Sequence, residues 1–113
     1  MGILDYVELP AKSVERQKAF YSEAFGWTFT PYGDAYAAHE DGPCQFALNG
    51  TGHHQGESAL PVVRVENIEA ACEAVRAAGG TITLEIFEFP GGRRFHFADP
   101  EGQHMAAYQP ERS

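Results

Sequence analysis

The alternation of apolar and polar residues predicts one helix and four strands in the first half of the chain. Ile3–Leu9 (ILDYVEL) is a strand-like run that ends at Pro10. Ser13 can cap a helix that carries apolar residues on one face and stops at Gly26. Three more strands are predicted after this helix, over Trp27–Thr30, Ala35–Glu40 and Pro43–Asn49.

The same order of elements returns in the second half. Pro61–Val65 reads as a strand, and Asn67 can cap a second helix that Gly79–Gly80 stops. Three strands follow, over Thr81–Leu84, Arg93–Ala98 and Gln103–Tyr108. At a spacing of 54 residues Ser13 aligns with Asn67. The chain is therefore predicted to contain one β-α-β-β-β unit twice.

This repeat predicts an α+β fold. Two tandem βαβββ modules, about residues 1–49 and 60–110, are expected to form a curved mixed sheet with a central cup and the helices outside. Residues 50–59 are rich in glycine and polar residues and form the predicted linker. A length of 113 residues suits a single domain, residues 1–113, with its own core.

Composition narrows the classes of partner. The chain has 16 acidic and 8 basic residues and a net charge of −8, so we expect no nucleic acid, which needs a basic surface. No apolar run is long enough to span a bilayer, and the N-terminal segment lacks a signal-peptide pattern. We therefore expect a cytoplasmic protein without membrane contact. The acidic balance suits either a solvated surface, the simpler interpretation, or attraction of a cationic ligand.

Three sequence motifs give the chain a family resemblance. They are VELP…AFYSEAFGW, RVENIEAACEAVRAAGG and GRRFHFADPEGQHMAAYQ. Together they resemble the vicinal oxygen chelate superfamily, which includes glyoxalases, extradiol dioxygenases and bleomycin-resistance proteins. The resemblance extends from Ile3 to Gln109 and implies the same paired βαβββ fold. Within the third motif, Asp99–Gly102 (DPEG) fits a type I turn by its residues alone.

The resemblance also implies where a divalent metal would bind, through the first and last strands of each module. Carried onto this chain, these positions are Tyr6, Phe46, Leu60 and Ala106. Only the tyrosine has a donor atom, and its reference pKa near 10 disfavours the phenolate form. Sites for Fe, Mn, Ni or Zn need nitrogen, oxygen or sulfur donors. No cofactor is therefore expected; the alternative is a divalent metal held by displaced ligands, His96 and His104.

Strand alternation adds further residues predicted to face the cup. The predicted ligand-binding set is Tyr6, Glu8, Trp27, Phe46, Leu60, Arg64, Arg94, His96, His104 and Tyr108. An apolar and aromatic lining with a few polar groups is typical of small-molecule sites. In the alternative interpretation the cup is collapsed and filled by its own side chains, with Glu8 and Arg64 as an ion pair.

Three functions follow from these expectations. The favoured one is a metal-free member that binds a small molecule, as bleomycin-resistance proteins bind an aromatic, cationic drug. The second is a glyoxalase-like lyase or isomerase, or a dioxygenase, with displaced metal ligands or with Glu8 or His96 as a general base. The third is a structural dimer with a filled cup. A homodimer is expected in each case, and no residue is assigned a catalytic role.

Overall fold

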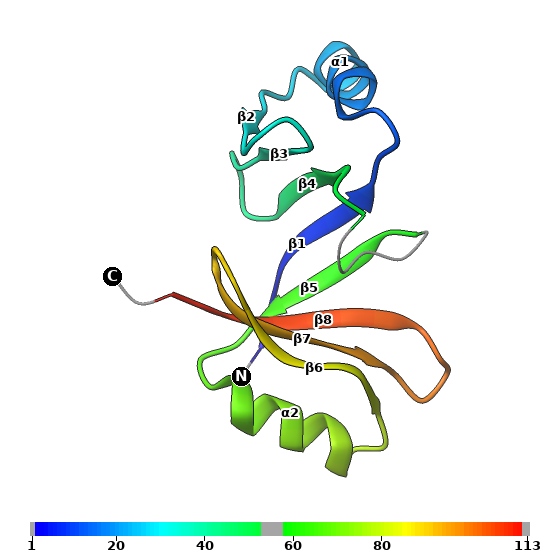
Figure 1. Ribbon diagram of the computed structural model, residues 1–113, viewed down its shortest axis with the longest axis vertical. Coiled ribbons are helices and arrows are strands. Elements are labelled where there is room, and N and C mark those ends of the chain that lie inside the picture. The colour runs from blue at the N-terminus through cyan, green and yellow to red at the C-terminus, as the bar shows by residue number, and fades with distance from the viewer. Residues whose placement is uncertain (1, 53–57, 112–113) are drawn as a thin grey trace. The chain divides into compact units, whose positions relative to one another are not determined.

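The computed structural model describes residues 2–52 and 58–111, which contain two helices and eight strands (Figure 1). The first module comprises β1 (Ile3–Pro10), α1 (Val14–Phe25), β2 (Thr30–Pro31), β3 (Tyr36–His39) and β4 (Gln45–Asn49). The second comprises β5 (Leu60–Arg64), α2 (Ile68–Ala77), β6 (Thr81–Phe89), β7 (Gly92–Ala98) and β8 (His104–Pro110). The α+β class and the repeated β-α-β-β-β order are confirmed.

The chain divides into two compact units close to the predicted module boundary. The N-terminal unit comprises residues 5–60, and the C-terminal unit comprises residues 61–111 together with residues 2–4. Residues 53–57 of the predicted linker lie outside the described residues. Among the described residues, neither helix has the length and apolar character needed to cross a membrane. The cup itself stays a prediction.

In the N-terminal unit the strand order is β2-β3-β4-β1, with β1 parallel to β4 and the other pairs antiparallel. The Ser13 hydroxyl accepts a hydrogen bond from the backbone N–H of Arg16 at 3.1 Å, which confirms the predicted cap of α1. Gly26 ends the helix with φ of 72°, a left-handed conformation that glycine adopts without strain. The helix start packs through Val14 against the sheet core.

The predicted strand Trp27–Thr30 is largely wrong, because only its last residue belongs to β2. The Trp27 ring is stacked on the ring of Tyr21 from α1 at 5.8 Å between centroids. On its other side it is stacked on the ring of His39 from β3 at 4.8 Å. This apolar run therefore serves aromatic packing under the helix rather than strand pairing.

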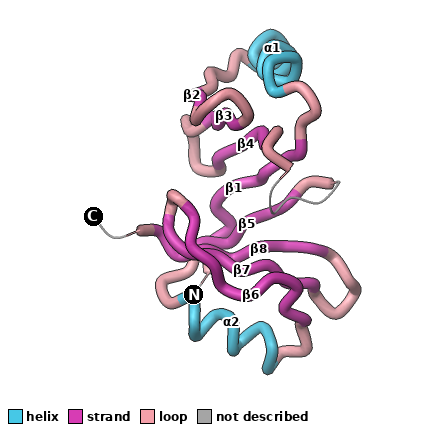
Figure 2. The backbone as a smooth tube through the Cα atoms, viewed as in Figure 1, coloured by secondary structure: helices cyan, strands magenta, loops and turns pink. Residues whose placement is uncertain are grey.

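In the C-terminal unit the order is β5-β8-β7-β6, with β5 parallel to β8 and the other pairs antiparallel. Helix α2 lies along one face of these strands (Figure 2). The buried core between helix and sheet consists of Ile68, Cys72, Phe95 and Ala107. Cys72 is thus a core thiol, as its helical position predicted, and burial raises its pKa.

Helix α2 is held at its first turn by two side chains. The Asn67 side-chain oxygen accepts a hydrogen bond from the backbone N–H of Ala70 at 3.0 Å, which confirms the predicted cap. Gln109 of β8 accepts one from the backbone N–H of Ile68 at 2.9 Å. The start of the helix is therefore fixed to the last strand of the sheet.

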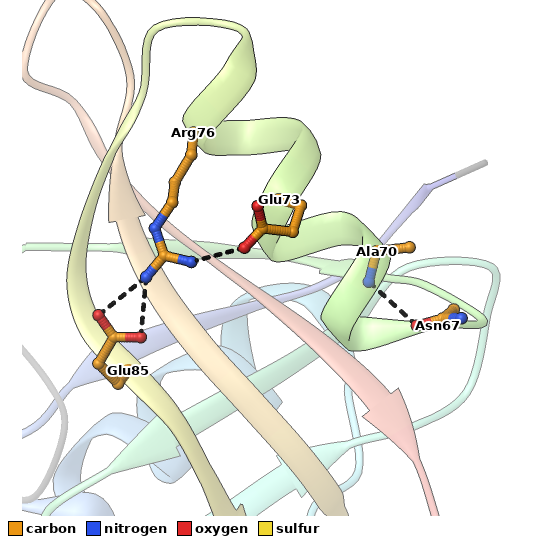
Figure 3. Close-up of polar contacts among 5 residues, drawn as sticks. All are labelled: Asn67, Ala70, Glu73, Arg76 and Glu85. Atoms are coloured by element: carbon orange, nitrogen blue, oxygen red, sulfur yellow. Dashed lines mark hydrogen bonds and ion pairs between the residues drawn. The ribbon is translucent and has the colours of Figure 1, made fainter.

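Arg76 joins α2 to strand β6 (Figure 3). Its guanidinium donates to Glu73 on the same helix at 3.0 Å and to both carboxylate oxygens of Glu85 on β6 at 3.0 Å. These side chains are exposed, so the pair contributes little to stability. The contact nevertheless places the Glu85 side chain on the side of the sheet that faces α2.

Strand β6 is longer than predicted and continues from Leu84 to Phe89. Its pairing with β7 contains two register shifts, between Ile82 and Leu84 and between Leu84 and Phe87. Each shift sets one extra residue on β6 against its partner, as in a β-bulge, and changes the face to which later side chains point. The register brings Phe87 opposite Arg94.

Candidate functional site

The two faces of the C-terminal sheet have different roles. Phe95 of β7 and Ala107 of β8 are buried in the core against α2. Because side chains alternate along a strand, Arg94, His96 and Ala106 lie on the opposite face. We call this surface the helix-distal face; its residues are Val62, Arg64, Leu84, Phe87, Phe89, Arg94, His96, His104, Ala106 and Tyr108.

A row of four side chains crosses the helix-distal face. The strand register aligns Phe87, Arg94, Tyr108 and Arg64 on β6, β7, β8 and β5 in turn. Arg94 is only 5% exposed. Its guanidinium carbon lies 5.6 Å from the ring centroid of Phe87 and 5.4 Å from that of Phe89, within range of a cation–π interaction. The Arg94 guanidinium is therefore a buried cation that lies over the rings of Phe87 and Phe89.

His96 and His104 lie on neighbouring strands of the same face, as the sequence predicted. His96 is directly opposite Ala106, and His104 is opposite Ala98, one diagonal step away. The His96 ring is 5.9 Å from the ring of Phe87. Within residues 2–52 and 58–111, no group of three or more His, Cys, Asp or Glu side chains could hold a metal ion.

The N-terminal unit contains a second polar group, centred on Glu8 of β1. This carboxylate is 2% exposed and accepts hydrogen bonds from the Tyr36 hydroxyl at 2.9 Å and the Asn49 side-chain nitrogen at 3.1 Å. The Asn49 oxygen accepts two further bonds, from the backbone N–H and hydroxyl of Thr51 at 2.9 and 2.6 Å. Leu9, the next residue after Glu8, packs towards α1, so Glu8 and Tyr6 lie on the other face.

Sequence reasoning placed Glu8 correctly on its strand but missed the two donors. Tyr36 and Asn49 are paired directly across β3 and β4. The sequence signal was that Asn49 ends one predicted strand, whereas Tyr36 lies at the start of the strand before it. A hairpin alignment of the two predicted strands would have brought them together.

The predicted cup positions of Phe46 and Trp27 are wrong. Phe46 packs against the α1 side of the sheet, with its ring 5.0 Å from the ring of Tyr21. Trp27 lies 5.4 Å from Phe46 in the same aromatic cluster. Both side chains therefore help to bury the helix and do not lie on the face of Glu8.

The strand register identifies the residue that takes the place predicted for Phe46. Glu8 pairs with Ala47, and Val62, which follows Glu8 by one repeat of 54 residues, pairs with Ala106. Ala47 is therefore the repeat counterpart of Ala106. The predicted position, Phe46, differs from Ala47 by one residue, and a shift of one residue along a strand moves a side chain to the other face.

The corrected residues do not fit a divalent metal at the positions that the resemblance implied. The set now reads Tyr6, Ala47, Leu60 and Ala106. Leu60 and Ala106 are 4% and 0% exposed, and neither they nor Ala47 has a donor atom. A phenol alone does not make a metal site.

Two shallow surface depressions involve none of the polar residues of the helix-distal face, although Phe89 of that face lines the second. One, of about 140 Å³, adjoins the start of α1, and the other, of about 210 Å³, lies at the β6–β7 hairpin. The second is lined by Glu88, Phe89, Gly92, Arg93, Gln109, Pro110 and Glu111. Both are open to solvent and contain no cluster of chemically active side chains, so we assign them no function.

Solved structures share this fold at low sequence identity. A hypothetical protein from Bacillus halodurans is 14% identical with a TM-score of 0.82, over 99% of this chain and 96% of that chain. Methylmalonyl-CoA epimerase from Mycobacterium tuberculosis is 16% identical with a TM-score of 0.71, over 96% and 88%. A glyoxalase/bleomycin resistance protein/dioxygenase superfamily member from Vibrio splendidus is 16% identical with a TM-score of 0.67, over 98% and 100%. At these identities the likeness establishes the fold alone.

The sequence itself also matches a family. A search of curated protein sequences gives no match. The model of the Glyoxalase/Bleomycin resistance protein/Dioxygenase superfamily matches residues 3–105, which is most of the chain. The protein therefore belongs to the glyoxalase/bleomycin resistance protein/dioxygenase superfamily, as its motifs predicted.

Proposed function

We propose that the protein binds a small organic molecule and does so without the divalent metal ion that members of its superfamily often hold. One observation carries this proposal. The implied ligand positions are occupied by Tyr6, Ala47, Leu60 and Ala106, which supply one phenol and otherwise only hydrocarbon. A Lewis-acid centre needs several nitrogen or oxygen donors, and this set does not provide them.

The chemistry of the helix-distal face supports small-molecule binding. Small-molecule sites combine an apolar or aromatic surface with a few polar groups that orient the ligand. Here Phe87 and Phe89 flank Arg94, while His96 and Tyr108 lie beside it on β7 and β8. Arg94, His96 and Tyr108 all belong to the ligand-binding set predicted from the sequence.

A second candidate function is a metal-dependent lyase, isomerase or dioxygenase with displaced ligands. The shared face of His96 and His104 favours it. Two imidazoles alone are a weak site for Fe, Mn, Ni or Zn, which usually take three or four protein ligands. We therefore rank it below metal-independent binding.

A homodimer is part of the proposal, because members of the superfamily are commonly dimeric. Light scattering on the purified protein tests it directly, with a mass of about twice 12.4 kDa expected. The cytoplasmic location stays a prediction from the sequence.

The binding proposal is tested with three matched probes on isotopically labelled protein kept in EDTA. Benzoate, benzyl alcohol and benzylamine have the same ring and differ in charge. We expect at least one of them to give saturable shifts in the backbone amide signals of β7 and β8, in the millimolar range usual for molecules of this size. Shifts that arise only after a divalent metal is added would support the enzyme candidate. Saturable shifts from none of the three probes would contradict the proposed function.

A further inference from the structure

We propose that Asn49 and Gly50, at the end of β4, form a self-modification site that the fold of the N-terminal unit protects. The backbone nitrogen of Gly50 attacks the side-chain amide of Asn49 once the unit opens, and the hydrogen bonds of the folded unit prevent this attack. The modified residue then no longer fits the end of the strand. This inference is independent of the proposed binding of a small molecule.

The reaction needs only these two residues and water. The Gly50 nitrogen forms a bond to the side-chain carbonyl carbon (Cγ) of Asn49, and the bond from that carbon to the amide nitrogen Nδ2 breaks. Ammonia leaves with the proton of the attacking N–H group, and a cyclic imide remains. Water then opens the imide on one side to give aspartate and on the other to give isoaspartate. Because glycine has no Cβ, the approach to the Gly50 nitrogen is unhindered.

In the folded unit both reacting groups are held by hydrogen bonds. The Gly50 N–H donates to the backbone oxygen of Ala35 at 2.7 Å, which fixes the attacking nitrogen. The Asn49 Nδ2 donates to the Glu8 carboxylate at 3.1 Å, and its Oδ1 accepts from the backbone N–H and the hydroxyl of Thr51 at 2.9 and 2.6 Å. Asn49 is also only 6% exposed. The side-chain carbon therefore cannot turn onto the nitrogen until several hydrogen bonds of a buried amide are broken.

The packing of the unit explains why this reactive pair is present. A Cβ added to Gly50 would lie 3.0 Å from the Val14 side chain of α1. It would also lie 3.2 Å from the backbone oxygen of Ala11 and 3.3 Å from that of Ala35. These approaches are closer than ordinary van der Waals contacts, so a larger residue is disfavoured. The side chain of Asn49 both donates and accepts, which an amide does and a carboxylate does not.

Neither product of the reaction reproduces the native contacts. Aspartate and isoaspartate both lack the N–H group that donates to Glu8, and a carboxylate in its place is a second acceptor. In isoaspartate the main chain also runs through the former side chain. The backbone oxygen of Asn49, which accepts from the backbone N–H of Ala11 at 2.9 Å, then belongs to a carboxylate outside the main chain. The end of β4 therefore cannot pair as before.

The chemistry is tested in guanidinium chloride at mildly alkaline pH, where folding has no influence. Peptide mapping by mass spectrometry, with fragmentation that separates isoaspartate from aspartate, follows both asparagines of the chain. We expect conversion at Asn49 and little at Asn67, which precedes the branched Ile68. Gly50→Ala should slow the conversion of Asn49 at least about tenfold, because a Cβ hinders the attacking nitrogen. Gly52→Ala is the matched control and should leave the rate unchanged.

The protection is tested on the wild type in buffer at the same pH. Asn49 should convert at least about tenfold more slowly there than in denaturant, since the unit must open first. Chains converted in denaturant and returned to buffer should have a lower urea midpoint than unconverted chains treated in the same way. Asn49→Asp, expressed directly, should also lower the midpoint and makes this comparison without a refolding step. Equal conversion rates in buffer and denaturant, conversion that Gly50→Ala does not slow, or an unchanged midpoint for Asn49→Asp would each overturn the inference.

Discussion

Replacing Phe95 with alanine is the sharpest test of the strand register on which the helix-distal face depends. Phe95 is 0% exposed and lies in the core with Ile68, Cys72 and Ala107 against α2. Removing a fully buried phenyl ring loses its transfer free energy and leaves a cavity. Such changes cost about 3–5 kcal/mol, which is a large part of the roughly 5–15 kcal/mol that stabilises a domain of this size.

Urea unfolding followed by far-UV circular dichroism measures this loss as a lower midpoint at constant slope. The control is His96→Ala at the next residue, whose side chain faces away from α2. We expect the control to lose no more than about 1 kcal/mol. A loss below about 1 kcal/mol for Phe95→Ala, or a larger loss for His96→Ala, would mean that β7 is shifted by one residue. In that case Arg94 would not lie on the helix-distal face.

Three further predictions concern the cap of α2, a close backbone approach between β7 and β8, and the ion pair between α2 and β7. Asn67→Ala removes the acceptor for the backbone N–H of Ala70 and should cost about 1 kcal/mol of unfolding free energy in urea, whereas Asn67→Asp should restore most of it. Gly92→Ala should destabilise the protein by more than about 2 kcal/mol by thermal unfolding, because Gly92 has φ of 145° and an added Cβ would lie 2.1 Å from a backbone oxygen of β8. Hydrogen bonding to Arg93 lowers the pKa of Glu69 below its ordinary value of 4.5, so the contribution of this pair is present at neutral pH and lost as the pH falls through the lowered pKa. Glu69→Gln should therefore lower the urea midpoint at neutral pH but not under conditions acidic enough to protonate Glu69, and equal effects at both pH values would contradict this account.

Most of the fold follows from local sequence signals. Ser13 and Asn67 cap the two helices as predicted, because a side-chain oxygen before an apolar helical pattern satisfies a free backbone N–H. The turn at Asp99–Gly102 also forms as predicted, with Gly102 at φ of 84°. These features depend on residues close together in the chain.

The errors arise where contacts between distant residues decide the outcome. Trp27 is in a β-prone run but is held in an aromatic stack with α1 and β3, so it does not join a strand. Phe46 was predicted on the face of Glu8, but the register of β1 with β4 gives that place to Ala47, one residue further along the strand. Both are large aromatic residues, for which packing against α1 outweighs the local pattern.

The residues of the candidate site could be predicted only where their positions depend on the local alternation of side chains along a strand. Alternation along β7 and β8 was sufficient to place Arg94, His96 and Tyr108 on one face. It did not reveal Phe87, because the shifts in register on β6 change which residues face the arginine. The aromatic environment of Arg94 is therefore a property of the folded sheet that the sequence pattern alone does not contain.

The central claim, that this protein works without a divalent metal, is tested most directly by elemental mass spectrometry of untagged protein purified without chelator. We predict no stoichiometric Fe, Mn, Ni, Zn or Co, and no change in thermal unfolding when these ions are added, because Tyr6, Ala47, Leu60 and Ala106 do not form a donor set. About one ion per chain, retained through dialysis and lost in His96→Ala and His104→Ala variants, would contradict the claim and establish a displaced metal site.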